Sequence, residues 1–519
     1  MRGLLQKEVW KMAMGVMRYT VKPVQPVQLD HGRILTSRKN TATGAVAVFF
    51  CLGEGRISVV LGTNWVDILK EELGLFLESD RRREMLIGER YYQGKHDILD
   101  RKKTIVGPGG RLEECKHLQN SRVVDNQYAR IVDQKVSYLL GKPLKITTER
   151  KEFTEALLDL FGPDFQRKLR LVAEDALNAG IGWLHPCYDG HGKLRFRRIA
   201  PWELRPFWAD DAKTELEGAM RVYQRERGGG MPADTVVEHF SPEGICCFVD
   251  CAGEFRMERG IRPYFSSAEG DGVWPAVPLI PFRAGFREIP LIRRVKGLQD
   301  GINLMLSDFQ DRMGEDTHHT VLVIRNFDGE DLGEFRRNLA TFGAVKVRGD
   351  GVDGGGVDTL SLEVNAGNFE AVLRLLKRGL VENAKGFDTR EISFAGSPNQ
   401  MAIQSMYADM DLDAGVMEIE FQAAFRELMG FVCAHFDRIE MPGLKPAEVE
   451  AIFYRDVLIN EAESIENCVR SASILSRETI LCQHPWTRDV EKEMQRLAGE
   501  ATEQAARERQ MPRLEGVPM

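Results

Sequence analysis

The sequence predicts an α+β chain of about three domains, and three observations support this. The chain has 519 residues, where one domain usually holds about 150. Residues 183 to 290 alternate short apolar and polar runs with aromatics, Gly and Pro, which is typical of strands. After Pro290 apolar residues recur every three or four positions, which is typical of long helices. We therefore expect a β-rich body followed by a helical half.

The composition is that of a folded, soluble protein. Apolar residues make up 43% and charged residues 29%, which argues against bulk disorder and fibrous repeats. No run approaches the roughly 18 to 20 apolar residues of a membrane span, so no membrane contact is expected. The start resembles no secretory signal. Nine cysteines, an odd number spread along the chain, are expected to be free thiols in a reducing cytoplasm.

The N-terminal half contains one sharply bounded helix. Residues 1–65 are interpreted as a short β segment or as upstream sequence outside the folded body. A helical pattern then begins at Asn64 and ends in the charged run 80–84. Over 125–141, apolar residues at helical spacing follow the possible caps Asp125 and Asn126, and Gly141 is expected to adopt the left-handed conformation. A strand over 145–148 and a helix over 165–179 follow.

The C-terminal half begins with a predicted helix over 291–315. One side carries Leu298, Ile302, Met305, Leu306, Phe309 and Met313, and the other carries Asp300, Asn303, Ser307, Asp308 and Asp311. A small α+β insert follows, with strands over 320–325, 344–347 and 359–364 and a helix over 328–340.

A second amphipathic helix, over 366–386, follows the insert and is expected to end at a left-handed Gly386. Ser397 as N-cap, Pro398 and Gln400 predict the start of the longest helix. The remainder to 497 is expected to be helical and 498–519 to be a frayed tail.

Two glycine- or acid-rich segments imitate ligand loops. The run 349–356 has aspartates where a P-loop needs Lys and Ser or Thr, so it is interpreted as a turn, and nucleotide hydrolysis is not expected. Residues 409–420 space their carboxylates like a calcium loop, but Ala414 stands at the position of the required Gly. An acidic helix face is the better interpretation of that segment.

No catalytic or metal-binding constellation is evident. Cys246 and Cys247 with Cys251 and His239 suggest zinc, but neighbours on a strand point to opposite faces. His318-His319 is interpreted as a solvated turn, and no nucleophile has an evident base. We therefore expect a structural protein with no cofactor. The alternative is a cytoplasmic multidomain enzyme with a dispersed active site.

Acidic charge is concentrated in the helical part. Residues 400–500 hold 9 basic and 19 acidic side chains, a net charge of −10, while the whole chain has −8. Tight binding of nucleic acid depends on many Lys and Arg contacts to phosphates. The balance therefore argues against a nucleic-acid clamp, although it permits loose passage of DNA.

Three strings resemble a known family. They are Tyr91-Tyr92-Gln93-Gly94-Lys95-His96-Asp97-Ile98, the long string from Asn126 to Pro143, and Ser476 to Thr479 with His484 to Glu491. Together they resemble the portal proteins (head-tail connectors) of tailed bacteriophages, of the type found in siphophages of Gram-positive hosts. The resemblance covers about residues 66 to 497 and leaves out the N-terminal extension, 1–65.

The resemblance implies the portal fold, with a β-rich wing, a two-helix stem, a small α+β clip, a long kinked helix and an α-helical crown. The implied regions are 66–290 for the wing, 291–317 and 366–386 for the stem helices, 318–365 for the clip, 387–398 for a tunnel loop, 399–497 for the long helix and crown, and 498–519 for a flexible tail.

The resemblance also implies a function and partners. Portals form rings of about twelve subunits at one capsid vertex and conduct double-stranded DNA during packaging and ejection. The implied partners are scaffold and major capsid protein, the terminase large subunit, and head-completion proteins, in the host cytoplasm and later in the virion. The implied DNA-facing residues of the tunnel loop are Asp388, Arg390, Glu391, Ile392 and Phe394. The clip residues expected to dock terminase or adaptor proteins are Asp331, Glu334, Arg336 and Arg337.

Overall fold

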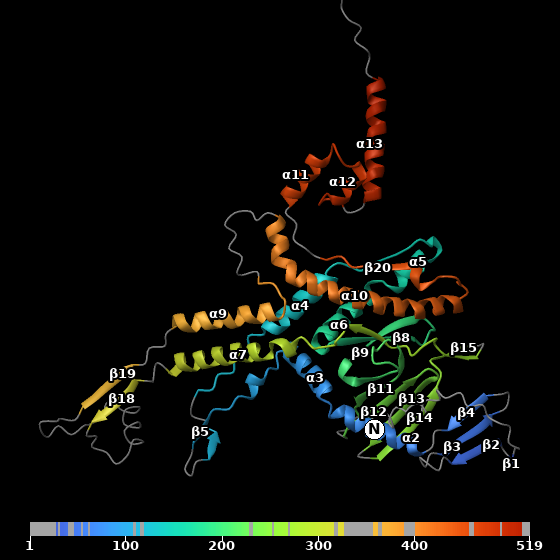
Figure 1. The fold of residues 1–519 in the computed structure, drawn as a ribbon, viewed down its shortest axis with the longest axis horizontal. Helices are drawn as coiled ribbons and strands as arrows, with labels where there is room; N and C mark the ends of the chain where they lie inside the picture. The colour runs from blue at the N-terminus through green and yellow to red at the C-terminus, as the bar shows by residue number, and fades with distance from the viewer. Residues whose placement is uncertain are drawn as a thin grey trace, which may run out of the picture. The chain divides into compact units, whose positions relative to one another are not determined.

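The computed structural model confirms the α+β class (Figure 1). It describes residues 27–29, 32–39, 46–52, 56–60, 63–106, 111–114, 119–227, 232–251, 254–267, 270–315, 320–325, 356–361, 366–388, 400–455, 461–487 and 490–510. The chain divides into two compact units. The first comprises Met1–Arg90, Ile146–Arg293 and Glu420–Glu450, and the second comprises Tyr91–Lys145, Arg294–Ile419 and Ala451–Met519.

The N-terminal segment forms an antiparallel sheet, in the order β1-β2-β3-β4. Its strands are β1 (Val27–Leu29), β2 (Gly32–Lys39), β3 (Val46–Leu52) and β4 (Arg56–Val60). The described strands between residues 27 and 60 agree with the interpretation of this region as a β segment.

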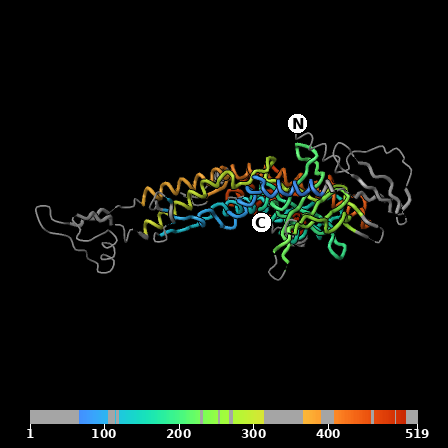
Figure 2. Tube along the Cα trace, turned by 90° about the horizontal axis from the view of Figure 1, so that it is seen from below, coloured from blue at the N-terminus to red at the C-terminus, as the bar shows by residue number. Residues whose placement is uncertain are grey.

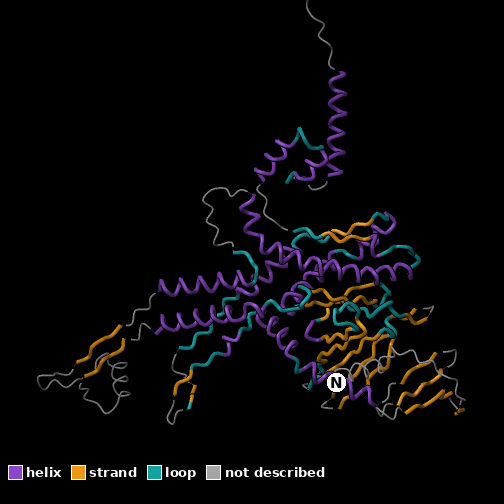
Figure 3. The backbone as a smooth tube through the Cα atoms, in the orientation of Figure 1, coloured by secondary structure: helices purple, strands orange, loops and turns teal. Residues whose placement is uncertain are grey.

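The predicted β-rich body consists mainly of two antiparallel sheets, drawn in orange in Figure 3. One is a five-stranded meander of β10 (Leu204–Trp208), β11 (Leu216–Arg225), β12 (Asp234–Ser241), β13 (Gly244–Cys251) and β14 (Glu254–Arg262). The other has the order β17-β8-β9, formed by β8 (Ile181–Tyr188), β9 (Leu194–Ile199) and β17 (Ile280–Arg283). β15 (Phe265–Ser267) and β16 (Gly270–Gly272) pair beside them.

Helices of the first unit close the core over these sheets. They are α2 (Thr63–Leu77), the larger part of α3 (Asp80–Tyr92), α5 (Lys151–Leu160) and α6 (Pro163–Ala179). Leu69, Leu73 and Phe76 of α2 pack with Met220 and Phe248 of the meander. The single helical pattern expected from Asn64 to residue 84 was wrong. The helical pattern is interrupted at Ser79, whose hydroxyl oxygen accepts a hydrogen bond from Arg82 N. The charged run 80–84 forms the start of the next helix, α3.

The second unit contains the helices predicted for the C-terminal half. α4 (Gln127–Leu140), α7 (Ile292–Glu315, of which 294–315 belong to this unit) and α9 (Ala366–Asn383) agree with their predicted ranges within a few residues. α7 and α9 run side by side (Figures 1 and 2). η1 (Asp97–Asp100), β5 (Thr104–Val106) and β6 (Leu112–Glu114) precede α4.

Between α7 and α9 two strands of the predicted insert are described. β18 (Thr320–Arg325) has the expected bounds, and β19 (Gly356–Ser361) starts three residues before its predicted position. They pair antiparallel, from Thr320 opposite Ser361 to Arg325 opposite Gly356. The predicted elements 328–340 and 344–347, His318-His319 and most of the glycine-rich run lie outside the described residues.

The remaining elements follow α9. They are α10 (Gln400–Arg438), η3 (Pro446–Glu448), β20 (Val449–Ile452), α11 (Glu461–Ser471), α12 (Arg477–Gln483) and α13 (Val490–Gln510), with β7 (Lys145–Thr148) earlier in the chain. The tail expected to fray from residue 498 is helical as far as Gln510, because Ala, Glu, Gln and Arg are strong helix formers. Ser397 and Pro398 lie outside the described part. No described helix has an apolar stretch long enough to cross a bilayer.

Two predicted glycine caps were wrong. Asn126 does cap α4, with its side chain accepting from Ala129 N at 2.9 Å, but Gly141 has φ −66° and ψ −33°. That helix ends where Pro143 removes an amide donor. At the end of α9 the left-handed residue is Lys385 (φ 52°), and not Gly386.

Candidate functional site

One side of α7 carries a stripe of buried polar residues. Gln299, Asn303, Ser307 and Asp311 follow one another at intervals of four, and none exposes more than 2% of its surface. We call these four residues the α7 polar stripe. The sequence placed Asn303, Ser307 and Asp311 on the polar side of the helix, where solvation is normal. Their burial means that each must have a partner within the protein.

The partner of the α7 polar stripe is the chain segment that leads into α4. Ser121 N donates to Asp311 at 2.7 Å, Val123 N to Ser307 at 2.9 Å and Asp125 N to Asn303 at 3.0 Å. Tyr128 N donates to Gln299 at 3.0 Å. Four residues of helix rise about 6.0 Å, and two residues of extended chain span about 6.6 Å. The near match lets the alternate amides of Ser121, Val123 and Asp125 meet successive turns of α7, while Tyr128 N, the fourth donor, already lies in α4. We call these four hydrogen bonds the ladder.

Two cationic side chains lie close to Asp311, the last residue of the α7 polar stripe. Lys103 Nζ lies 2.9 Å and Arg101 Nη1 3.2 Å from the carboxylate, and Arg101 also pairs with Asp308. Burial favours the neutral acid, but Lys103 and the amide of Ser121 outweigh it and lower the pKa of Asp311. The ionised carboxylate therefore ties the chain at 101–103 to α7.

A buried histidine joins the other part of the ladder to α3. His96 accepts at Nδ1 from the amide of Asn303 at 2.7 Å, so its Nε2–H donates to Tyr91 O at 2.9 Å. Its ring stacks on Tyr91 with 4.5 Å between centroids. Burial lowers the pKa of His96, and the neutral tautomer is the form that satisfies both contacts.

The Tyr91 hydroxyl extends this network to charged groups of α7. It donates to Asp300 at 2.5 Å, and Lys296 Nζ bridges Asp300 at 2.7 Å and Asp97 at 2.6 Å. The amide of Asn126 donates to the carbonyls of Tyr91 and Tyr92 at 3.0 and 3.1 Å. Residues of the first two strings, 91–98 and 126–143, thus meet around α7 as parts of one hydrogen-bonded scaffold.

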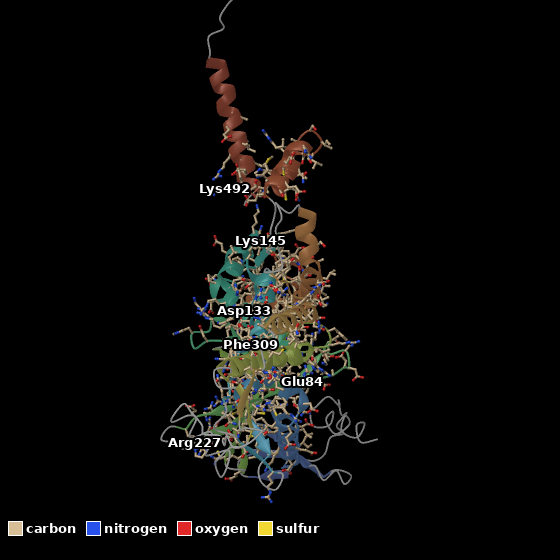
Figure 4. The ribbon with its side chains drawn as sticks, turned by 90° about the vertical axis from the view of Figure 1, so that its left-hand side faces the viewer. Glu84, Asp133, Lys145, Arg227, Phe309 and Lys492 are labelled. Carbon is tan, nitrogen blue, oxygen red and sulfur yellow. The ribbon has the colours of Figure 1, made fainter. Side chains whose placement is uncertain are left out.

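α7 packs directly against α9. Phe309, labelled in Figure 4, stacks on Phe369 at 4.1 Å between centroids, and the Lys377 ammonium lies 2.6 Å from Asp125 at the ladder. Farther along α9, Val372 and Leu375 are exposed to 44% and 67%. The helix pair therefore has one side fixed to the ladder and an apolar side left uncovered in the single chain.

The side chains that resembled metal ligands in the sequence form other contacts within the protein. Asp411 and Asp413 lie within α10, where Asp411 pairs with Arg455 and Asp413 with Lys135, so the calcium-like spacing is a helix face that forms ion pairs. Cys246 is buried in the core while Cys247 contacts Glu258. Among the residues that the structure describes, no group of three or more His, Cys, Asp or Glu converges on a common point.

A family model for phage portal proteins, SPP1 Gp6-like, matches residues 78–507. This chain belongs to that family. As a phage portal protein it is a structural component of the virion. The match contains the ladder, the His96 network and both helices α7 and α9.

Two portal proteins of phages that infect Gram-positive bacteria are similar along most of their length. The portal protein of Bacillus phage SPP1 is 26% identical over 430 residues, which cover 81% of this chain and 84% of that protein. The portal protein of Clostridium phage phiCD119 is 25% identical over 442 residues, covering 81% and 94%. A chain from the neck of a native GTA particle aligns with 13% identity and a TM-score of 0.37, over 68% of this chain and 87% of that one.

Of the predicted portal contact residues, the structure describes only Asp388. It accepts from Arg130 at 3.3 Å and its side chain is 21% exposed, so in the single chain it is engaged with α4. Arg390, Glu391, Ile392 and Phe394 of the predicted tunnel loop lie outside the described residues, as do the clip residues Asp331, Glu334, Arg336 and Arg337.

Sequence reasoning missed the α7 polar stripe because it searched for apolar periodicity. The signal that could have revealed it is the strict four-residue repeat of hydrogen-bonding side chains from Gln299 to Asp311. The partner segment, 119–126, gives no such signal, since an extended chain that bonds to side chains has no periodicity of its own.

Proposed function

We propose that this chain assembles into a ring of about twelve copies at one capsid vertex and conducts double-stranded DNA during packaging and ejection. The single observation that carries the proposal is the match to the phage portal family over residues 78–507. The dispersed-site enzyme has no observation in its favour.

The described elements fit the regional assignment that the resemblance implied. On this proposal the wing is 66–290, the stem helices are α7 and α9, and β18 and β19 begin and end the clip. The tunnel loop is 387–398, α10 is the long helix, α11 to α13 form the crown, and 1–65 is an extension.

The uncovered side of the helix pair supports assembly. Val372 and Leu375 of α9, together with Leu304 and Met313 of α7, are exposed to between 44% and 67%. Large exposed apolar side chains of this kind are the material of an interface, and a head-to-tail contact between copies closes into a ring when its rotation permits. A neighbouring copy is therefore the proposed cover.

The proposed partners follow from the role of a portal. They are double-stranded DNA, scaffold and major capsid protein during assembly in the host cytoplasm, the terminase large subunit, and later the head-completion proteins. The net charge of −8 suits a conduit, because attraction to phosphates would slow a moving duplex. We propose that the chain does not hydrolyse ATP and that the docked motor supplies the work.

Negative-stain electron microscopy and light scattering of the purified chain test the proposal. The expected result is annuli with a central hole and a mass about twelve times 58.7 kDa. A 58.7 kDa monomer at all concentrations and salt levels, without annuli, would contradict it.

Docking of terminase is tested separately. Replacing Asp331, Glu334, Arg336 and Arg337 together by Ala is expected to leave rings intact and to weaken binding of the terminase large subunit. Unchanged binding and packaging would show that these four residues do not form the docking surface.

A further inference from the structure

The chain leaves α9 through a turn that reverses its direction. Lys385 N donates to Glu382 O at 3.0 Å and Gly386 N donates to Val381 O at 2.9 Å, which are the two hydrogen bonds of a Schellman motif. Lys385 occupies the left-handed position, where glycine is usual. The turn satisfies the last carbonyls of α9 and leads directly into Phe387 and Asp388.

Helix α4 contacts each of these four residues. Its Lys135 ammonium donates to Lys385 O at 3.3 Å, and Gln134 and Arg130 contact Phe387 and Asp388. A Cβ on Gly386 would lie 2.6 Å from Ile131 Cδ1, so a larger residue at this position requires the Ile131 side chain to shift. Residues 385–388 thus cross one side of α4, formed by Arg130, Ile131, Gln134 and Lys135, which we call the α4 latch.

Gln134 makes the most specific contact of the α4 latch. Its amide nitrogen donates to Phe387 O at 2.8 Å and its amide oxygen accepts from Phe387 N at 3.0 Å. One side chain therefore satisfies both backbone groups of a residue that is only 7% exposed. Because both bonds must form together, they define the orientation of the peptide units on either side of Phe387.

The α4 latch also engages α10, which follows the same loop. Lys135 lies 2.7 Å and Lys385 3.0 Å from Asp413. Burial lowers the pKa of Lys135, although Asp413 opposes this, and the two ammonium groups hold the pKa of Asp413 below its usual value. Phe387 stacks on Tyr407 of α10 at 4.4 Å between centroids. One helix thus contacts both the residues before the loop and the helix after it.

We infer that Gln134 is the positioning residue for the loop that starts at Phe387, and that the α4 latch, not α9, sets the direction in which this loop leaves the helix pair. This inference rests on the proposed portal function and deepens it. The same contacts assign α4 a role in retaining DNA, through the base of the loop.

Hydrogen exchange on the full chain tests the inference first. In Gln134→Ala both bonds to Phe387 are lost, and the amide of Phe387 is expected to exchange at least about tenfold faster than in the wild type. Gln134→Glu keeps an acceptor for Phe387 N but loses the donor to Phe387 O, so it is expected to lie between the two. Ser137→Ala, at an exposed position of the same helix, is the matched control and is expected to change nothing.

Particle measurements test the functional half. Gln134→Ala rings are expected to form as in the wild type, and particles carrying them are expected to retain less DNA, while Ser137→Ala particles retain the normal amount. Exchange at Phe387 within twofold of the wild type in Gln134→Ala would overturn the positioning role. Faster exchange with normal DNA retention would overturn the functional role of the α4 latch. The exchange result does not depend on ring formation, and failure of the wild type to form rings would instead contradict the proposed function.

Discussion

Single polar side chains hold the second unit together at points where the sequence suggested only a hydrophilic face. Asn303 is fully buried and makes three contacts, accepting from Asp125 N and Gln299 and donating to His96. A buried donor or acceptor without a partner costs about 1 to 3 kcal/mol. The stability of this region therefore depends on individual hydrogen bonds as much as on apolar area.

Asn303→Leu is expected to lower the free energy of unfolding by about 2 to 4 kcal/mol, because it leaves the Asp125 amide and His96 Nδ1 without their partner. Chemical denaturation of the purified variant measures this. Gln310→Ala, at an exposed position of α7, is the control and is expected to stay within about 0.5 kcal/mol of the wild type. A loss no larger than that of the control would show that the polar ladder is dispensable.

Helices with an apolar side could be predicted from the sequence, and contacts with distant backbone could not. α4, α7 and α9 were recognised from apolar spacing, and β18 was recognised with its bounds. The end of α9 was placed correctly but with the wrong residue in the left-handed position. A local rule identifies glycine with a left-handed turn, whereas Gly386 lies against Ile131 of another helix, within 2.6 Å of where a Cβ would stand. The sequence of residues 380–390 alone does not show that Ile131 lies beside Gly386.

The contact between α9 and α4 gives a double-mutant prediction. Gly386→Ala is expected to destabilise the chain by about 1 to 3 kcal/mol, because the new methyl group meets Ile131 Cδ1. Ile131→Val removes that carbon and alone is expected to cost about 0.5 to 1.5 kcal/mol. In the double variant the two losses are expected to be clearly less than additive. Additive losses in chemical denaturation would contradict the proposed reason for Gly386.

Four histidines favour the neutral form: His96, His185 and His239 are buried, and His435 is half-buried. Burial lowers the pKa of His185 and of His239 to about 4, and it also lowers the pKa of His96 and His435. The unfolded chain takes up these protons below about pH 6.5, where the folded chain does not. The contribution of these histidines to stability is therefore expected to be constant above about pH 6.5 and to fall as the pH decreases toward 4.

His185→Asn isolates one histidine of this acid response. His185 is buried and Nδ1 lies 2.6 Å from Pro278 O, a carbonyl to which the Asn amide can also donate. Between pH 6 and pH 4.5, the variant is expected to lose less stability than the wild type, by up to about 1.4 kcal/mol per pH unit. Equal slopes in denaturation curves measured across this range would contradict the assignment.

On the proposed function, the whole molecule is a subunit whose exposed apolar side chains are covered by neighbouring copies. The resemblance of three short strings predicted the family, and the match over residues 78–507 established it. The ring of copies stays a prediction from the resemblance, and the exposure of Val372 and Leu375 in the single chain is consistent with it, since apolar periodicity alone does not separate core from interface residues.

The most direct test is a cryo-electron microscopy reconstruction of the assembled protein, calculated without imposed symmetry. The account predicts a closed ring around a central channel, with Val372 and Leu375 of α9 covered by the adjacent copy and Phe387 still bonded to Gln134 near the channel wall. A ring in which those two side chains face solvent, or an assembly with no channel, would contradict it.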